Sequence, residues 1–249
     1  MAVKLPFAFE TPLPGQFIML RIKGKSEPFL GRPLSVYAFQ RRREKVICEV
    51  LYRVVGKGTQ QFSLLKFGST VEVLGPLGRS FTIFPSEKDV ILIAGGMGIA
   101  PMTYVAGHYR GSKAGSKMKM ICYTGARSMD DLVALERMEV LCKTKVSTDD
   151  GSRGYHGMVT DLFKNDFPTL NIKKTVIYAC GPRPMLKALA AILEDQPVIC
   201  EVSLEERMAC GVGVCLGCVT AIKDDRGNKQ YKRVCKEGPV FNIKDIMWD

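Results

Sequence analysis

The chain has 249 residues, of which 46% are hydrophobic and 24% charged, a composition typical of a globular protein with a sizeable core. No apolar run approaches the roughly 20 residues that cross a bilayer, and residues 1–15 lack the apolar segment of a signal peptide, so we expect a cytoplasmic protein without a membrane span. The net charge of +11 would suit an anionic partner or cofactor, but the basic residues are dispersed, and their main run, RRREK at 41–45, is typical of an exposed hairpin turn.

The first 86 residues consist of short β-rich runs broken by Gly and Pro, and several runs alternate apolar and polar residues. This pattern predicts a small antiparallel β barrel over residues 1–86. Its expected strands are QFIMLRI, PLSVYAF, VICEVLYRVV, TVEVLG and SFTIF, and TQQFSLLKF is expected to form one helical turn.

From residue 87 to 202 the pattern changes to alternating strands and helices, which predicts an α/β domain with a parallel sheet covered by helices. The segment FPSEKD supplies a polar linker at the boundary with the barrel. Ser128 followed by Asp131 resembles a capping box and predicts that a helix begins there. The expected strands are DVILIAG, MKMICYT, TKVST, TVIYAC and PVICEV, and the expected helices are APMTYVAGHYR, SMDDLVALERMEVLCK and RPMLKALAAIL.

A glycine-rich turn follows the first strand of this α/β domain, in VILIAGGMGIAPM at 90–102. Glycines allow close approach of a pyrophosphate, and free amides at a helix start attract its charge, although a tight structural turn between strand and helix also explains glycines. The usual dinucleotide fingerprint is imperfect, because Pro101 takes the place of the third glycine. YTGAR and YACGPRPM follow later strands, where the crevice of an open sheet binds ligands. The candidate nucleotide-binding residues are Gly95, Gly96, Gly98, Pro101, Gly125, Arg127, Gly181 and Pro182.

Residues 203–249 are loop-rich and carry four of the nine cysteines; CVTAIK and QYKRVC are expected to form a hairpin around DDRGNK. Cys210 is followed by Cys215, Cys218 and the more distant Cys235, which is the C-x4-C-x2-C…C order of plant-type 2Fe-2S sites. Structural zinc also takes four thiolates, but it favours paired C-x2-C knuckles, and this segment has one such pair. We therefore predict a small 2Fe-2S module held by these four cysteines, with Cys200 excluded because it ends an apolar strand.

The motif GRPLSVY in the barrel and the glycine turn in the α/β domain together resemble the ferredoxin-reductase-type flavoproteins, which join a flavin barrel to a nicotinamide domain. The resemblance implies that Arg32 pairs with the FAD diphosphate, that Ser35 lies beside the isoalloxazine ring, and that Gly58 and Thr59 offer amides and a hydroxyl to phosphate. It further implies FAD-site positions at Pro33, Leu34, Leu51, Tyr52 and Arg53.

A narrower resemblance covers nearly the whole chain: GPLGRSF, AGGMGIAPM, GARS, CGPRPML and SLEERMACGVGVCLGC are similar to segments of the electron-transfer subunits of two-subunit, NAD-linked dihydroorotate dehydrogenases. It implies FAD, NAD and 2Fe-2S cofactors, and a heterotetramer of two such chains with two FMN-containing catalytic subunits, in pyrimidine biosynthesis. It also places Cys180 near the reactive nicotinamide carbon, where the alternative is a buried thiol at a strand end. The family usually opens with a strand, whereas the 13 residues before PGQF show little strand character, so either the barrel is one strand short or the sequence starts late.

Two further questions stay open at this point. Asp149 and Asp150 would repel the 2′-phosphate of NADP and favour NAD, whereas Arg127 and Arg153 would attract that phosphate. The alternatives in function are a reductase subunit of another NAD(P)H-dependent complex, of ferredoxin, oxygenase or hydrogenase type, and a zinc-stabilised nucleic-acid-binding protein. We prefer the redox interpretation, with no nucleic acid or membrane as partner, and expect both histidines to be structural or exposed.

Overall fold

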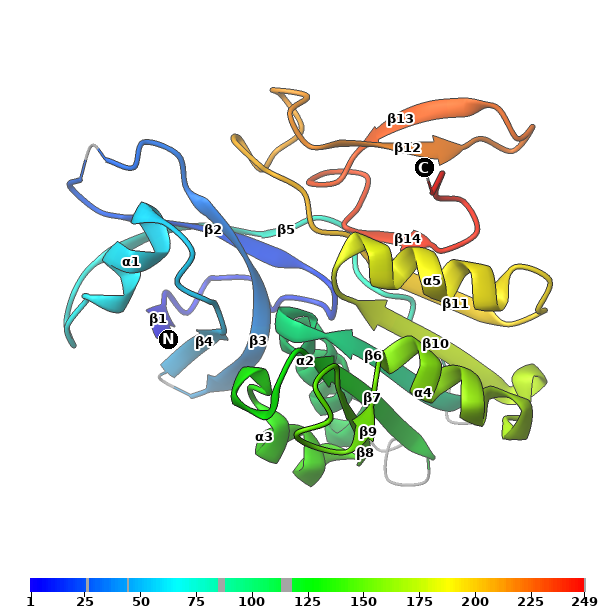
Figure 1. Ribbon diagram of the computed structural model, residues 1–249. Helices are drawn as coiled ribbons and strands as arrows, with labels where there is room; N and C mark the ends of the chain where they lie inside the picture. Colours follow the sequence, from blue (N-terminus) through cyan, green and yellow to red (C-terminus); the bar gives the residue numbers. More distant parts are fainter. Residues whose placement is uncertain (26, 44, 85–87, 113–117, 249) are drawn as a thin grey trace.

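The computed structural model describes residues 1–25, 27–43, 45–84, 88–112 and 118–248. It consists of a curled antiparallel sheet, a larger and mostly parallel sheet with helices on both faces, and a C-terminal hairpin (Figure 1). This three-part architecture is the one that the sequence predicts.

The curled sheet forms a half-barrel from the first third of the chain. Its apolar side chains, including Ile18, Leu20 and Val36, are buried in a core of their own. In chain order its elements are β1 (Ala2–Leu5), β2 (Phe17–Ile22), β3 (Arg32–Arg42), β4 (Lys45–Val50), α1 (Lys57–Ser63) and β5 (Val71–Leu77). The strand order in the sheet is β1-β4-β3-β2-β5, and β3 and β4 form the hairpin predicted around the basic run.

Three expectations for the half-barrel are wrong. The first residues do form a strand: β1 pairs with β4 from Ala2 opposite Glu49 to Leu5 opposite Val46, and the alternating Val3 and Leu5 are buried. Conversely, SFTIF forms no strand within the described residues, and β4 ends at Val50 rather than continuing through residue 55. A four-residue alternation was too short to recognise at the start, and an apolar run that packs against another domain was mistaken for a strand.

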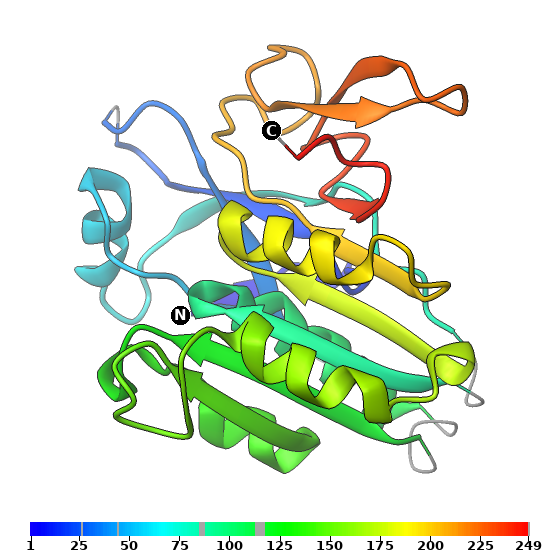
Figure 2. The same cartoon turned by 45° about the vertical axis from the view of Figure 1, so that its right-hand side comes forward.

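Within the described residues, the larger sheet has seven strands in the order β14-β11-β10-β6-β7-β8-β9, and β14 alone pairs antiparallel (Figure 2). Its strands are β6 (Asp89–Gly95), β7 (Met120–Ala126), β8 (Lys143–Thr148), β9 (Tyr155–His156), β10 (Thr175–Cys180), β11 (Ile199–Ser203) and β14 (Val240–Asn242). The helices are α2 (Ile99–Gly111), α3 (Leu135–Leu141), α4 (Val159–Asp166) and α5 (Arg183–Leu193). Short 3-10 turns are η1 (Gly96–Gly98), η3 (Met129–Asp131), η4 (Phe167–Thr169) and η5 (Ile172–Lys174).

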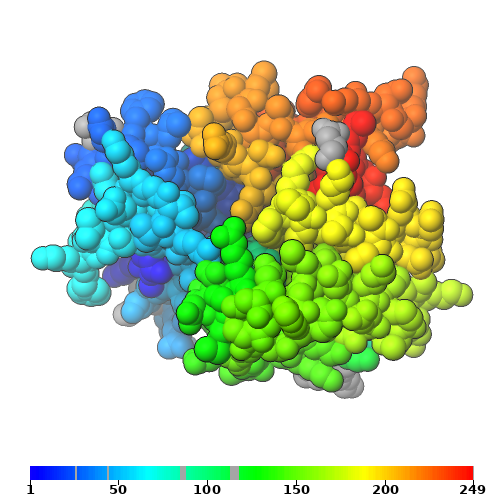
Figure 3. All heavy atoms as spheres, viewed as in Figure 1, coloured from blue at the N-terminus to red at the C-terminus, as the bar shows by residue number. Residues whose placement is uncertain are grey.

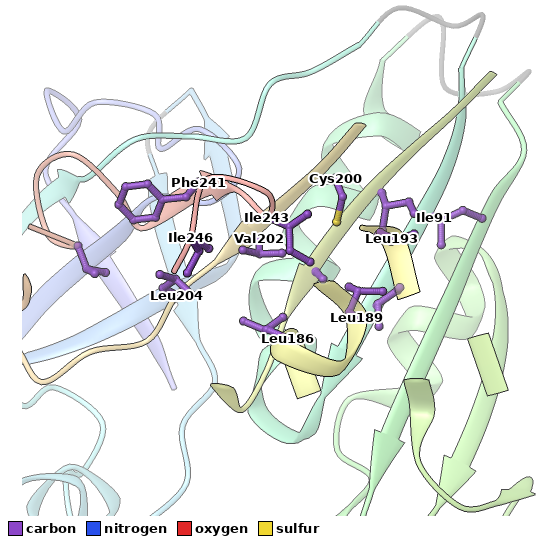
Figure 4. Close-up of a cluster of buried hydrophobic side chains, with 14 of the residues drawn as sticks. Ile91, Leu186, Leu189, Leu193, Cys200, Val202, Leu204, Phe241, Ile243 and Ile246 are labelled. Atoms are coloured by element: carbon purple, nitrogen blue, oxygen red, sulfur yellow. The ribbon is translucent and has the colours of Figure 1, made fainter. Parts of the chain in front are cut away.

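The sequence of the central strand β6 is continuously apolar because the strand contributes to a core on each face of the sheet. Ile91 and Ile93 join the core under α4 and α5, whereas Val90 and Leu92 join the core under α2 and α3. A strand covered on both faces must be apolar at every position. On α5, the buried residues recur at helical spacing, so that Leu186, Leu189 and Leu193 face the sheet (Figure 4).

The helix predicted from Ser128 begins later than expected. Residues 129–131 form the turn η3, Ala134 has a positive φ of 57°, and α3 then starts at Leu135. The Ser128 side chain does not cap this turn; the Met129 N–H instead donates to Ser152 Oγ over 2.8 Å. Asp131 forms an ion pair with Arg53 of the half-barrel, at 2.9 Å. A contact between domains therefore replaces the predicted first turn.

The C-terminal segment forms the predicted hairpin, from β12 (Val219–Lys223) and β13 (Lys229–Arg233), and then returns to the larger sheet as β14. Leu204, Phe241, Ile243 and Ile246 share one core with α5 and β11 (Figure 4). The domain boundary predicted after residue 202 thus falls within β11, and the one predicted after residue 86 lies outside the described residues. In the described part of the chain, no helix combines the length and apolarity needed to cross a membrane.

Candidate functional site

The glycine turn lies at the topological switch point of the larger sheet. The strand order reverses between β6 and its neighbour β10, because β7 and β8 continue on one side and β11 on the other. Ligands of open α/β sheets bind at the carboxyl ends of strands where the order reverses. The predicted residues lie at or just beyond the carboxyl ends of β6, β7 and β10, so the fold brings these three groups to one edge of the sheet.

The glycines at this edge are required for different physical reasons. A Cβ on Gly98 would lie 2.0 Å from the carbonyl oxygen of Cys180, so only glycine lets α2 begin against β10. Gly96 has a φ of +52° and open space around it, as expected where a ligand approaches the backbone. Gly95 and Gly181 pack against Met185, and Gly125 against Val159. Pro101 is buried inside α2.

The surface is hollowed where the half-barrel, the α/β domain and the C-terminal segment meet (Figure 3). The open backbone at Gly96, in the turn η1 that leads into α2, leaves room for a pyrophosphate to approach the main chain closely. Arg127 is exposed after β7, and Pro182 is exposed after β10. These residues fit a dinucleotide at the switch point.

Cys180 is the last residue of β10 and is 1% exposed. Burial raises the pKa of its thiol well above the usual value. The thiol is therefore neutral at physiological pH, and it matches the alternative of a buried strand-end thiol. Its catalytic role stays a prediction.

The acidic pair that bears on nucleotide preference follows β8. The Asp149 N–H donates to Ala126 O and the Asp150 N–H to Arg127 O, both over 3.1 Å, so this turn lies beside the end of β7. Hydrogen bonds from Ser152 lower the pKa of the Asp150 carboxyl.

We expect replacement of Asp150 by alanine to weaken a preference for NADH over NADPH by about fivefold, because exposed charge pairs contribute up to about 1 kcal/mol. Initial rates with both nucleotides and an artificial electron acceptor measure this, with Asp161→Ala on α4 as the control. A clear NADPH preference in the unaltered chain would contradict the assignment.

The half-barrel brings Arg32 and Gly58 together, as the resemblance implies. A Cβ on Gly58 would lie 2.5 Å from Arg32 Nε, and the guanidinium donates to Leu30 O over 3.0 Å and to Gly31 O over 3.2 Å. Gln61 Oε1 is buried and has no hydrogen-bond partner in the described structure. Arg32, Gly58 and Gln61 line one small cavity. The guanidinium and the bare glycine fit a phosphate-bearing nucleotide such as FAD, and the orphaned Gln61 oxygen would accept from a hydroxyl or amino group of that nucleotide and not from its phosphate.

The other predicted flavin-site residues differ in their contacts and in their burial. The Thr59 hydroxyl accepts from the Val55 and Gly56 amides and donates to Gly56 O, so it closes the turn before α1 instead of facing a ligand. Tyr52 packs edge-on against Phe62, with ring centroids 5.9 Å apart. On β3, Leu34 is buried, whereas Pro33 and Ser35 are half-buried; after β4, Leu51 is half-buried and the exposed Arg53 is the partner of Asp131.

Sequence reasoning missed Gln61. Its signal was its position on α1, three residues after Gly58, because residues at this spacing lie on one side of a helix.

We expect replacement of Arg32 by leucine to weaken FAD binding by about 10- to 100-fold, because hydrogen bonds to charged groups contribute roughly 1.5–3 kcal/mol. Titration of the flavin-free protein with FAD measures the affinity. Arg21→Leu is the matched control, since Arg21 lines the same cavity but pairs with Glu72 at 2.8 Å. Equal FAD affinity in the two variants would place the diphosphate elsewhere.

The cysteine loop is shaped by glycines and by amides directed at sulfur. Gly211 and Gly213 have φ values of +72° and +84°, and a Cβ on Gly211 would lie 2.6 Å from Met19 Cγ on β2. Hydrogen bonds from backbone amides, with that of Cys215 first, lower the pKa of the Cys210 thiol to about 6. The loop is thus packed on the half-barrel and favours thiolate at Cys210.

The four cysteines lie in two pairs. Cys210 hydrogen-bonds with Cys215, and Cys218 with Cys235, whose N–H donates to Cys218 Sγ over 3.4 Å. Burial and the neighbouring Cys218 raise the pKa of Cys235 to about 12. No three His, Cys, Asp or Glu side chains of the described residues converge closely enough to hold a single ion as placed. Four thiols and sulfur-directed amides fit the donor set of an iron–sulfur cluster.

Comparison with known proteins assigns the family. Residues 205–247 match the model "Iron-sulfur cluster binding domain of dihydroorotate dehydrogenase B", and residues 92–191 match "Oxidoreductase NAD-binding domain". The chain is 39% identical to the "Dihydroorotate dehydrogenase B (NAD(+)), electron transfer subunit" of Caldanaerobacter subterraneus subsp. tengcongensis, covering 95% of this chain and 88% of that protein. The protein of the same description from Listeria monocytogenes serovar 1/2a is 40% identical, covering 94% and 87%.

The chain belongs to this electron-transfer subunit family. Among solved structures, it is similar to one described as a NADH-dependent reduced ferredoxin-NADP oxidoreductase, with a TM-score of 0.79, 29% identity, and coverage of 95% of this chain and 80% of that one. A ferredoxin reductase in carbazole 1,9a-dioxygenase shares the fold, with a TM-score of 0.61, 22% identity, and coverage of 76% and 58%. The expected cofactors FAD, NAD and a 2Fe-2S cluster agree with these matches, whereas the zinc interpretation does not.

Proposed function

We propose that this chain is the electron-transfer subunit that exchanges electrons between the FMN of a dihydroorotate dehydrogenase catalytic subunit and NAD, in cytoplasmic pyrimidine biosynthesis. The observation that carries the proposal is the cysteine loop, because it lies within the matched iron–sulfur region and packs directly on the flavin-type half-barrel.

The residues present suit a relay of cofactors. Gly96, Gly98 and the start of α2 would hold the NAD pyrophosphate, Arg32 and Gln61 the FAD, and Cys210, Cys215, Cys218 and Cys235 the cluster. A bound flavin exchanges electrons singly or in pairs, and it therefore links a two-electron nicotinamide with a one-electron cluster. The chain itself supplies the open backbone at Gly96 and the Arg32 guanidinium for the anionic groups.

The catalytic partner is expected to cover the cysteine loop. Val212, Val214 and Leu216 are 41%, 78% and 61% exposed around the cysteines. Exposed apolar residues beside a redox centre suit a protein surface that brings another redox centre close. The proposed assembly is a heterotetramer with two copies of each subunit.

Co-expression with an FMN-containing dihydroorotate dehydrogenase subunit tests the proposal. We expect a stable complex, with the mass of two copies of each subunit by light scattering, that reduces NAD with dihydroorotate and shows flavin absorption bands with a broad iron–sulfur shoulder. A stable complex with a different redox protein, and no dihydroorotate-dependent NAD reduction, would refute it. This outcome would favour the second candidate, a reductase subunit of ferredoxin type, which the 29% identity to the ferredoxin-NADP oxidoreductase structure supports.

A further inference from the structure

The segment Gly78–Phe84, between β5 and β6, contacts all three parts of the molecule. Toward the half-barrel, Gln16 Nε2 donates to Gly78 O and the Phe81 N–H donates to Pro14 O, both over 2.8 Å. Toward the cysteine-bearing segment, the Arg79 N–H donates to Gly238 O over 2.5 Å. Gly78–Phe84, which includes the apolar run mistaken for a strand, therefore connects the parts of the molecule, and we call this segment the joint.

Thr82 attaches this joint to the α/β domain through every polar group that it has. Its N–H donates to Glu201 Oε2 over 2.8 Å, and its hydroxyl donates to Glu201 Oε1 over 2.7 Å. Its carbonyl accepts from Tyr178 OH over 2.5 Å. Both oxygens of the half-buried Glu201 carboxylate thus bind one exposed residue, and this two-point contact defines its orientation.

Two neighbouring aromatic residues extend the attachment. The ring of Phe81 packs edge-on against Tyr178 with centroids 5.1 Å apart. Tyr109 OH lies 2.8 Å from Tyr178 OH and accepts from the Phe84 N–H over 3.1 Å. The orientation of the joint is therefore set by β10, β11 and α2 of the α/β domain.

The other contact between half-barrel and α/β domain, where α2 packs on β3, encloses a cavity and is also held by Tyr104, which is buried in the half-barrel core and donates its OH to Pro12 O over 2.6 Å. A cavity of about 450 Å³ lies between β3 and α2, with Tyr37, Thr103, His108 and Arg137 among its lining residues. Close packing fixes the relative position of two elements, whereas a cavity of this size leaves that position less determined. On this side the partly exposed ion pairs Arg137–Glu49, at 2.7 Å, and Arg53–Asp131, at 2.9 Å, also join the two domains.

Glu201 lies close to the predicted nicotinamide site along a rigid pair of strands. β11 pairs with β10 from Ile199 opposite Val176 to Ser203 opposite Cys180, so Glu201 precedes the strand end at Cys180 by two residues in register. A displacement of the joint against β11 would therefore change the position of the half-barrel relative to the Cys180 edge.

We propose that Glu201 is a positioning residue for electron transfer between nicotinamide and flavin: by holding Thr82, it fixes the half-barrel relative to the α/β domain. This inference rests on the proposed function, because it takes the half-barrel as the FAD site and the Cys180 edge as the NAD site. Transfer of a hydride between two rings depends steeply on their distance and alignment.

Stopped-flow reduction of the FAD-loaded protein by NADH tests this inference, with rates expressed per bound FAD. We expect Glu201→Gln and Thr82→Val to slow flavin reduction by about tenfold, with an unchanged Kd for NADH and unchanged iron content. The primary isotope effect with NADH deuterated at the transferred position should rise, because misalignment affects the transfer step itself. Thr82→Ser keeps the hydroxyl and should restore the rate.

Glu194→Gln, which removes an exposed carboxylate at the end of α5, is the matched control and should leave rate and isotope effect unchanged. Wild-type rates and isotope effects per bound FAD in both Glu201→Gln and Thr82→Val would overturn the positioning role, even if either variant lost part of its FAD. Failure of the unaltered protein to reduce its FAD with NADH would instead overturn the proposed function.

Discussion

Replacement of Cys218 by serine is expected to abolish the iron–sulfur cluster while leaving the flavin in place. Cys218 is 2% exposed, and its Sγ accepts from the Cys235 N–H, so its thiolate would face the cluster from the buried side. A serine hydroxyl is a poor substitute for a thiolate ligand of iron. Electron transfer to the catalytic subunit should fall by at least about 100-fold, since even indirect partners of metal ligands contribute 10- to 100-fold.

Iron content and the visible spectrum measure the loss of the cluster, and NADH-dependent reduction of a flavin-specific acceptor shows that the other sites survive. Cys200→Ala is the matched control: Cys200 is also buried, but it lies in the core beneath α5 (Figure 4) and not in the cysteine loop. The control should retain iron. A Cys218→Ser protein with full iron content would remove Cys218 from the ligand set.

Short sequence patterns predicted those elements whose structure depends on residues close together in the chain. The apolar DVILIAG strand and the glycine turn each depend on neighbouring residues, and both are found in the structure. The strand β14 was missed because its three residues pair with β11, some 40 residues earlier in the chain, and short strands carry little periodicity.

The candidate site was predicted unevenly for the same reason. Arg32 and Gly58 meet as expected, whereas the Thr59 hydroxyl is used within its own turn. A hydroxyl next to a glycine-rich turn bonds equally well to backbone or to phosphate, and the sequence does not distinguish these outcomes. The Thr82–Glu201 contact joins residues 119 positions apart, and no local pattern identifies such a pair.

Replacement of Gly98 by alanine is expected to have the largest effect on stability. Its Cβ would lie 2.0 Å from the carbonyl oxygen, 2.4 Å from the carbonyl carbon of Cys180 and 2.9 Å from the Gly181 nitrogen. All three atoms are backbone, so no side-chain rotation relieves the clash, and α2 must move away from β10. Overpacking of this kind costs about 3 kcal/mol, which lowers the Tm of a chain this size by about 10 °C.

The same displacement should weaken NADH binding, because the start of α2 and the end of β10 both border the predicted pyrophosphate site. Gly107→Ala is the matched control in the same helix: nothing lies within 4 Å of the added Cβ, and alanine in a helix interior is about 0.5–1 kcal/mol more favourable than glycine. Thermal unfolding and NADH titration should therefore separate the two variants in opposite directions. If Gly98→Ala unfolds at the wild-type temperature and binds NADH normally, the close approach of α2 and β10 is not required for the site.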